Sequence, residues 1–196
     1  MSDSLAPDRV LPLLTGRFGG VYRYSEQTPS TQRMLGPDDP EGSVAVADEQ
    51  TEGRGRLGRS WHAPAGTALL FSTVLIPAVE PARLPELSLV AGAAVAEAIA
   101  EVSALEPEIK FPNDVLIGGR KVAGILAESS EGRVVLGIGV NANQGAAELP
   151  SDAQTAPTSL RLELGRRVDR AELLAAILAR LELAYDRWLR DTARSG

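Results

Sequence analysis

A run of apolar segments separated by very short turns, in the middle of the chain, constrains the fold more than any other feature. Val115–Ile117 and Lys121–Ala127 flank the dipeptide Gly118-Gly119, which is typical of a hairpin with a two-residue turn. Val134–Val140 follows after the turn Glu131-Gly132-Arg133. Turns this short join antiparallel strands, so the pattern predicts three antiparallel neighbours in one sheet.

The rest of the apolar pattern predicts further strands and separate helices. Strands are expected over residues 21–25, 43–49, 67–76 and 109–111, and a loop over 144–157. Helical spacing runs from Leu84 to Val102, and a last helix opens with the capping pair Asp169 and Glu172 and reaches Trp188. A helix of about two turns is expected to begin within residues 28–31. Together these elements predict an α+β fold with a mixed, largely antiparallel sheet.

Composition excludes several classes of function. The chain has 196 residues, no cysteine and a single histidine, His62. Disulfides, thiolate metal sites, cysteine nucleophiles and multi-histidine metal sites are therefore excluded. A net charge of −6 argues against a nucleic-acid binder, because phosphate contacts need clustered cations. We therefore expect no DNA partner.

Length and the absence of targeting signals suggest where the chain acts. The length fits one domain, residues 1–196. The N-terminus carries Asp3 and Asp8 and has no apolar run, so no signal peptide is expected. The longest apolar stretch, residues 87–100, is too short and too weak to span a bilayer. We expect a cytoplasmic protein that does not engage a membrane.

A glycine- and arginine-rich segment, GRGRLG at residues 53–58, is the first candidate site. It lacks the order of a P-loop and, with no helix after it, fails the dinucleotide fingerprint. Its glycines let backbone amides approach an anion, and Arg54, Arg56 and Arg59 can pair phosphates or carboxylates. Glu49 and Glu52 are the only acidic partners close in sequence. The alternative is a solvated surface loop.

The second candidate site holds both lysines of the chain, Lys110 and Lys121. Lys110 and Asp114 flank a Pro-Asn turn, and Lys121 lies in the next strand. Simple alternation places Lys121 on the same side as Ala123, Ile125 and Ala127 and places Arg120 on the other. A lysine among small apolar residues is costly to desolvate unless an anion meets it. The alternative is an edge-strand lysine whose ammonium reaches water.

These pieces together resemble a known family. The segments that carry the resemblance are PSTQ at 29–32, EQTEGRGRLGRSW at 49–61, KFPNDV at 110–115, KVAGILAE at 121–128 and GIGVNAN at 137–143. They occur in the order seen in biotin–protein ligases, which join biotin to a lysine of a biotin carboxyl carrier protein. The resemblance covers about residues 20–190. It implies a ligase catalytic domain, a biotin–acetyl-CoA-carboxylase ligase, with a mixed sheet and helices on one side, the class II synthetase-like fold.

The resemblance also implies roles for individual residues. Biotin would be bound by residues on three segments: Ser30, Thr31, Gln32, Gln50, Arg54, Gly55, Arg56, Lys121 and Gly124. ATP would be bound by a second set: Arg56, Arg59, Trp61, Lys110, Asn113, Asp114 and Asn141. Lys121, Arg54 and Lys110 would be catalytic, and Asp114 is the candidate ligand for Mg²⁺. Phe111 stands where the family usually has Trp, and Gln32 where it commonly has Asn.

The resemblance implies a two-step reaction. Biotin and ATP would give biotinyl-5′-AMP and pyrophosphate, with Mg²⁺ as cofactor, and the carrier lysine would then take the biotinyl group. We expect neither the N-terminal DNA-binding domain nor the C-terminal small β-barrel that some family members carry. A lipoate or octanoate ligase and a non-catalytic biotin-binding regulator are the alternatives. The resemblance is compatible with a homodimer as well as a monomer.

Overall fold

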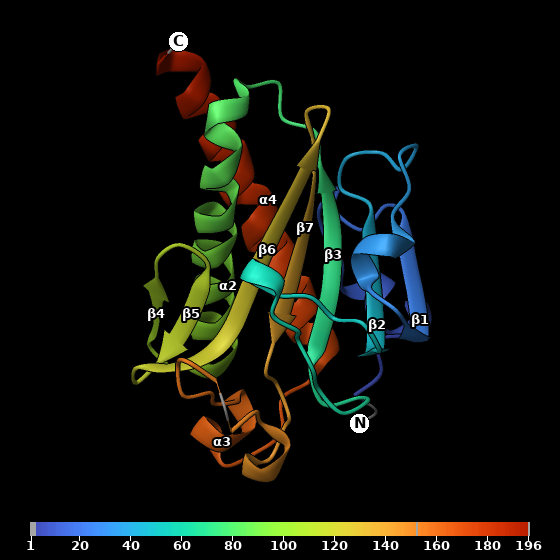
Figure 1. Ribbon diagram of the computed structural model, residues 1–196. Helices are drawn as coiled ribbons and strands as arrows, with labels where there is room; N and C mark the ends of the chain where they lie inside the picture. The colour runs from blue at the N-terminus through green and yellow to red at the C-terminus, as the bar shows by residue number, and fades with distance from the viewer. Residues whose placement is uncertain (1–2, 152, 196) are drawn as a thin grey trace.

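The computed structural model describes residues 3–151 and 153–195, with a seven-stranded sheet of order β1-β2-β3-β7-β6-β5-β4 at its centre (Figure 1). The strands are β1 (Tyr22–Thr28), β2 (Val44–Gln50), β3 (Leu69–Leu75), β4 (Pro107–Lys110), β5 (Asp114–Ile117), β6 (Arg120–Ser130) and β7 (Arg133–Val140). Only the β1–β2 pair is parallel, and the other neighbours are antiparallel. The prediction of a mixed, largely antiparallel sheet is confirmed.

The predicted tight turns hold β5, β6 and β7 in register. Ile117 pairs with Arg120, so Gly118-Gly119 is a two-residue turn, and both glycines have positive φ, 54° and 75°. Such a turn needs left-handed backbone at both positions, which glycine adopts without strain. The next turn is tighter than predicted, because Ser130 already pairs with Arg133.

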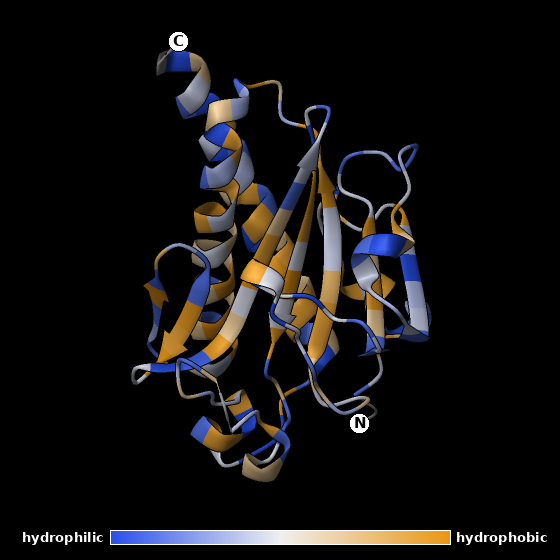
Figure 2. Ribbon diagram, viewed as in Figure 1, coloured by the Kyte–Doolittle hydropathy of each residue, from blue (hydrophilic) through white to orange (hydrophobic). Residues whose placement is uncertain are grey.

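Two long helices cover one face of the sheet, α2 (Leu87–Ser103) and α4 (Arg170–Ser195). One cluster of buried side chains joins them to the strands, and it reaches from Leu5 to Trp188. Figure 2 shows hydrophobic residues concentrated along the central strands. Burial of this apolar area is the main force that holds the helices on the sheet. The opposite face of the sheet is covered in part by the segment that connects β2 to β3.

Short helical elements complete the fold: α1 (Pro7–Val10), α3 (Leu160–Leu164) and 3₁₀ turns at Leu11–Leu13, Thr31–Met34, Arg56–Gly58, Pro81–Glu86 and Ala146–Glu148. The helix that is expected to begin within residues 28–31 does begin there, at Thr31, but it is a four-residue 3₁₀ turn instead of about two helical turns. Thr28 ends β1, and the 3₁₀ turn receives no side-chain cap from Ser30. The Thr31 hydroxyl bonds Gln50 and Ser72 in the pocket instead.

The predicted start of the last helix is confirmed. Asp169 Oδ1 accepts hydrogen bonds from the backbone N–H groups of Ala171 at 2.9 Å and Glu172 at 3.2 Å. These N–H groups have no partner within the helix, so the carboxylate supplies one. No helix among the described residues is long and apolar enough to cross a membrane.

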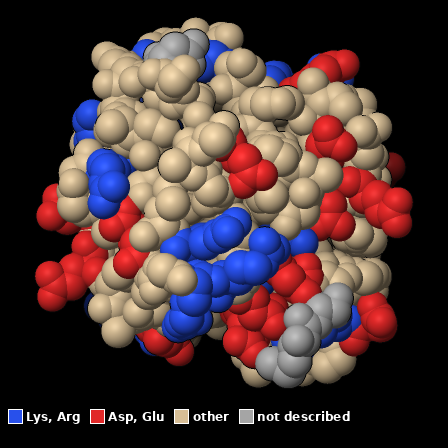
Figure 3. Space-filling model, turned by 90° about the horizontal axis from the view of Figure 1, so that it is seen from below, with Lys and Arg blue, Asp and Glu red and all other residues tan. Residues whose placement is uncertain are grey.

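Charge is unevenly spread over the surface. The face seen from below in Figure 1, where α3 lies, carries a band of basic side chains with acidic side chains beside it (Figure 3). A net charge of −6 therefore coexists with a locally positive surface, which can attract anions at short range.

Candidate active site

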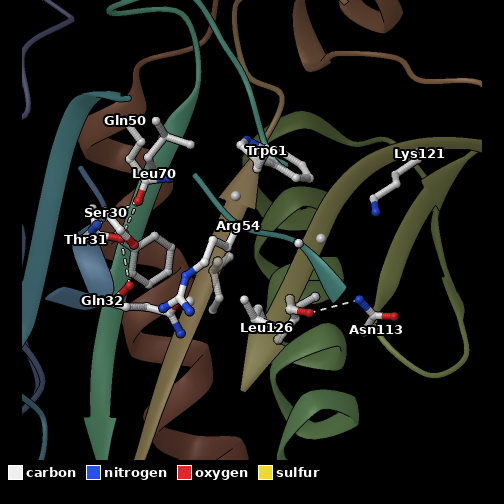
Figure 4. A pocket seen from close by; sticks show the side chains of 18 residues that line it. Ser30, Thr31, Gln32, Gln50, Arg54, Trp61, Leu70, Asn113, Lys121 and Leu126 are labelled. Carbon is white, nitrogen blue, oxygen red and sulfur yellow. Dashed lines mark hydrogen bonds between the residues drawn. The ribbon is translucent and has the colours of Figure 1, made fainter. Parts of the chain in front are cut away.

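A pocket lies on the sheet face opposite the two long helices (Figure 4). Strands β2, β3, β6 and β7 form its floor and walls, and residues 51–61, the arginine loop, cross over it. Ten of the predicted residues line it, namely Ser30, Thr31, Gln32, Gln50, Arg54, Gly55, Trp61, Asn113, Lys121 and Gly124.

One end of the pocket is polar and buried. Thr31 Oγ1 lies 2.7 Å from Ser72 Oγ and donates to Gln50 Oε1 at 3.0 Å. The backbone N–H of Thr31 donates to the same oxygen at 2.7 Å. Ser30, at 2% exposed, lines the same end. Hydroxyl and amide groups held this firmly can recognise a ligand with several hydrogen-bonding atoms.

The floor of the pocket is flat because glycines replace side chains on β6 and β7. The Trp61 indole lies on this floor, and a Cβ added at Gly139 would come within 2.6 Å of its ring. A Cβ at Gly124 would come within 2.9 Å of the same ring. Gln32 lies in the same way over Gly137. The indole Nε1 is buried and has no hydrogen-bond partner among the described residues.

The other end of the pocket is cationic. Lys121 Nζ forms an ion pair with Asp114 Oδ1 at 2.7 Å and lies 5.6 Å from the centre of a Trp61 ring. Both side chains of the pair are largely buried, at 25% and 20% exposed. A desolvated ammonium with one carboxylate partner can still attract a second anion that enters beside it.

The alternation predicted for Lys121 is wrong, and a β-bulge is the reason. Val115 pairs with Ala123 but Leu116 pairs with Lys121, so β6 has one extra residue, Val122. The extra residue shifts the side-chain alternation. Lys121 therefore shares the pocket face with Gly124, whose added Cβ would lie 3.1 Å from Nζ, instead of facing the core with Ala123.

The arginine loop is tied to the rest of the chain by polar contacts. Arg54 pairs with Glu128 at 2.8 Å, a partner that the sequence did not suggest, since Glu52 pairs instead with Arg33. Arg56 donates to Asn113 Oδ1 at 3.1 Å. These contacts are exposed, so each contributes on the order of 1 kcal/mol or less and can be exchanged for a ligand.

Besides Arg56 and Asp114, three predicted residues lie outside the lining of the pocket. Arg59 donates to Gln154 at 2.7 Å and Lys110 donates to Thr155 at 2.9 Å. Asn141 is buried, and its amide is used by Thr158 and Gln144. All three therefore contact residues 154–158. The same segment bonds the backbone of Lys121, because the Lys121 N–H donates to the carbonyl oxygen of Ala156.

Sequence reasoning missed several residues of the pocket. Ser72 lies in the apolar strand LLFSTVL, and nothing local distinguishes it from a core serine. Gly137 and Gly139 could have been predicted, because two glycines two positions apart in a strand lie on one face and leave a flat surface for a ligand or side chain.

The described residues contain no group of three or more His, Cys, Asp or Glu side chains that could hold a metal ion. Asp114 is the one predicted metal ligand at the pocket, and it pairs with Lys121. Magnesium is commonly bound by one or two carboxylates together with substrate phosphates. Asp114 could supply such a carboxylate.

Comparison with known proteins identifies the family to which this fold and pocket belong. A model of the biotin/lipoate A/B protein ligase family matches residues 24–144. The chain belongs to this family, which confirms the resemblance carried by its motifs.

Within the family, the chain is similar to biotin ligases. It is 41% identical over 172 residues to the biotin–acetyl-CoA-carboxylase ligase of Mycobacterium tuberculosis, covering 83% of this chain and 63% of that protein. It is 38% identical over 182 residues to the bifunctional ligase/repressor BirA of Bacillus subtilis, covering 88% and 56%. It thus spans little more than half of the latter relative's length.

A solved structure shows the same fold. The biotin protein ligase from Aquifex aeolicus in complex with biotin and ATP superposes with a TM-score of 0.80 and 35% identity. The match covers 88% of this chain and 73% of that one. The predicted fold class is confirmed.

Proposed function

We propose that this chain is a biotin–protein ligase, which activates biotin with ATP and then transfers it to a lysine of a biotin carboxyl carrier protein. The observation that carries the proposal is the polarity of the pocket. A buried end with hydroxyl and amide groups faces a cationic end at Lys121, across an apolar glycine floor. Biotin has the same order of parts: a ureido ring, an aliphatic chain and a carboxylate.

The polar end would bind the ureido ring. A ureido group has one carbonyl acceptor and two N–H donors, and it needs partners for all of them when it is buried. Ser30, Thr31, Gln50 and Ser72 supply hydroxyl and amide groups there. The dithiolane of lipoate offers no partner for the donors and acceptors that these groups do not use among themselves, and this favours biotin over lipoate.

The cationic end would carry out the first step. A carboxylate oxygen of biotin attacks the α-phosphorus of ATP, the bond to the bridging oxygen breaks, and pyrophosphate leaves with the bond electrons. Two anions must approach each other, so Lys121 and Arg54 would lower their repulsion and stabilise the charge that develops on the phosphate. Asn113 and Arg56, in contact at 3.1 Å, lie beside them and are proposed to bind ATP.

We propose that Mg²⁺ arrives as part of the substrate, bound to the phosphates of ATP, with Asp114 as a candidate contact. The ion would neutralise phosphate charge, and the chain's own cations would orient the reacting groups. The carboxylate of Asp114 also positions Lys121, since their side chains lie 2.7 Å apart.

In the second step, the amine of a carrier lysine attacks the acyl carbon of biotinyl-5′-AMP, and AMP leaves. The mixed anhydride must be protected from water until then. The arginine loop lies over the pocket, and its exposed contacts can be exchanged for phosphate contacts as it closes.

A pyrophosphate-release assay with ATP and one of three acids tests the proposal. Biotin should support release, whereas lipoate and octanoate should give no more than background. Release with lipoate or octanoate instead would identify the lipoate-ligase alternative. Biotin binding without pyrophosphate release would identify a non-catalytic regulator.

A further inference from the structure

Three buried side chains at the polar end of the pocket form a hydrogen-bond chain. Gln50 Oε1 accepts from the backbone N–H of Thr31 at 2.7 Å and from Thr31 Oγ1 at 3.0 Å. A backbone N–H can only donate, so the oxygen of the Gln50 amide, and not its nitrogen, must face Thr31. The backbone thereby fixes the orientation of this amide.

The amide orientation in turn assigns the hydroxyl protons. Thr31 has one hydroxyl proton, and it must point at Gln50 Oε1, because otherwise two oxygen lone pairs would face each other. Thr31 Oγ1 then accepts its remaining bond from Ser72 Oγ, 2.7 Å away. The chain therefore runs from Ser72 through Thr31 to Gln50, and Ser72 is its origin.

This direction decides what the pocket offers to a ligand. The Gln50 Nε2 lies on the side of Gly53, where an added Cβ would meet it at 3.0 Å, and it offers N–H donors. The protons of Ser72 and Thr31 are already used, so these hydroxyls offer lone pairs only. Donors beside acceptors match a cyclic urea, whose carbonyl accepts and whose N–H groups donate.

We propose that Ser72 is a positioning residue that determines specificity, because its hydroxyl donates to Thr31 and holds in place the hydroxyl acceptor that, beside the Gln50 amide, selects a urea ring. This inference rests on the proposed function, since it concerns the same pocket. Ser72 is 0% exposed and Thr31 is 3% exposed, so water does not replace the bond between them when it is lost.

The next residue along the strand supplies a matched control. Thr73 is also 0% exposed and also carries a hydroxyl, but its Oγ1 has no hydrogen-bond partner among the described residues. Successive side chains of a strand point to opposite faces, so Thr73 faces away from the pocket. Thr73→Val removes a buried hydroxyl without touching the chain that begins at Ser72.

The experiment measures steady-state pyrophosphate release against biotin concentration, with a biotin carboxyl carrier protein as acceptor, for the wild type, Ser72→Ala and Thr73→Val, with thermal unfolding of each. Ser72→Ala should raise KM for biotin about tenfold while kcat stays within about threefold, because the lost contacts act on binding. Thr73→Val should leave both constants unchanged. Ser72→Cys, which keeps the size and a weak donor, should give an intermediate KM.

A double-mutant cycle tests whether Ser72 acts through Thr31. In a Thr31→Val background, Ser72→Ala should change KM by no more than about twofold, because the path is already broken. In a Thr31→Ser background, which keeps the hydroxyl, the full effect should return.

Two results would overturn the inference while leaving the proposed function intact. One is a folded Ser72→Ala protein with the wild-type KM, and the other is an equal rise in KM with and without the Thr31 hydroxyl. A wild type that releases no pyrophosphate with biotin would instead refute the proposed function, and the inference with it.

Discussion

Lys121→Met should separate catalysis from folding at the cationic end of the pocket. Methionine keeps the length and much of the apolar volume of the lysine side chain, so packing against Trp61 is retained. The substitution removes the ammonium and leaves Asp114 without the partner that lies 2.7 Å away.

The two expected effects differ in size. The ion pair is 25% and 20% exposed, so its loss should cost about 1–2 kcal/mol of unfolding free energy. Domains are typically stable by about 5–15 kcal/mol, so the variant should remain folded. Loss of a cation that stabilises developing charge should slow adenylate formation by about a hundredfold, equivalent to about 2.7 kcal/mol.

Single-turnover formation of biotinyl-5′-AMP, measured together with urea unfolding, distinguishes these effects. Arg120→Met is the matched control, since its guanidinium pairs with Glu163 away from the pocket and is half exposed. The control should keep the parent rate within about twofold. A folded Lys121→Met protein that forms the adenylate at the parent rate would refute the role given to Lys121.

Three further predictions concern other parts of the molecule. Residues 52–60 should be cut by protease more slowly with biotin and ATP than without, because phosphate would replace their exposed contacts; equal rates would contradict this. Gly139→Ala should displace Trp61 and shift its fluorescence, since the new Cβ would lie 2.6 Å from the ring; an unchanged spectrum would contradict the packing. A hydrogen bond from Arg23 holds the pKa of Asp39 below its ordinary value, so this stability is present above about pH 4 and lost in acid. Arg23→Gln should therefore move acid unfolding, followed by circular dichroism, to higher pH, and an unmoved midpoint would contradict it.

The sequence predicted the parts of the fold that local chemistry determines. The turn at Gly118-Gly119 and the cap at Asp169 follow from residues within a few positions of each other. The parallel pairing of β1 with β2 could not be predicted in this way, because it depends on packing between segments about twenty residues apart. The short 3₁₀ turn after Ser30 shows the same limit. A capping pattern predicted a helix there, but the Thr31 hydroxyl bonds Gln50 and Ser72 instead.

The site was predicted where its motifs are local and was missed where they are not. The resemblance located Ser30, Thr31 and Gln50, and the structure brings them together. Ser72 reaches them only across the sheet, and an isolated serine in an apolar strand gives no sign of this. The face of Lys121 was predicted wrongly because alternation assumes a regular strand, and the bulge at Val122 breaks that rule.

The most direct test of the account is the chemical identity of the product formed in the pocket. The purified chain is incubated with biotin, Mg²⁺ and ATP labelled in its α-phosphate, and the acid-quenched mixture is analysed by mass spectrometry. The account predicts labelled biotinyl-5′-AMP in an amount close to that of the protein, since the pocket should retain the adenylate when no carrier is present. Intact ATP with biotin bound and unmodified would contradict it.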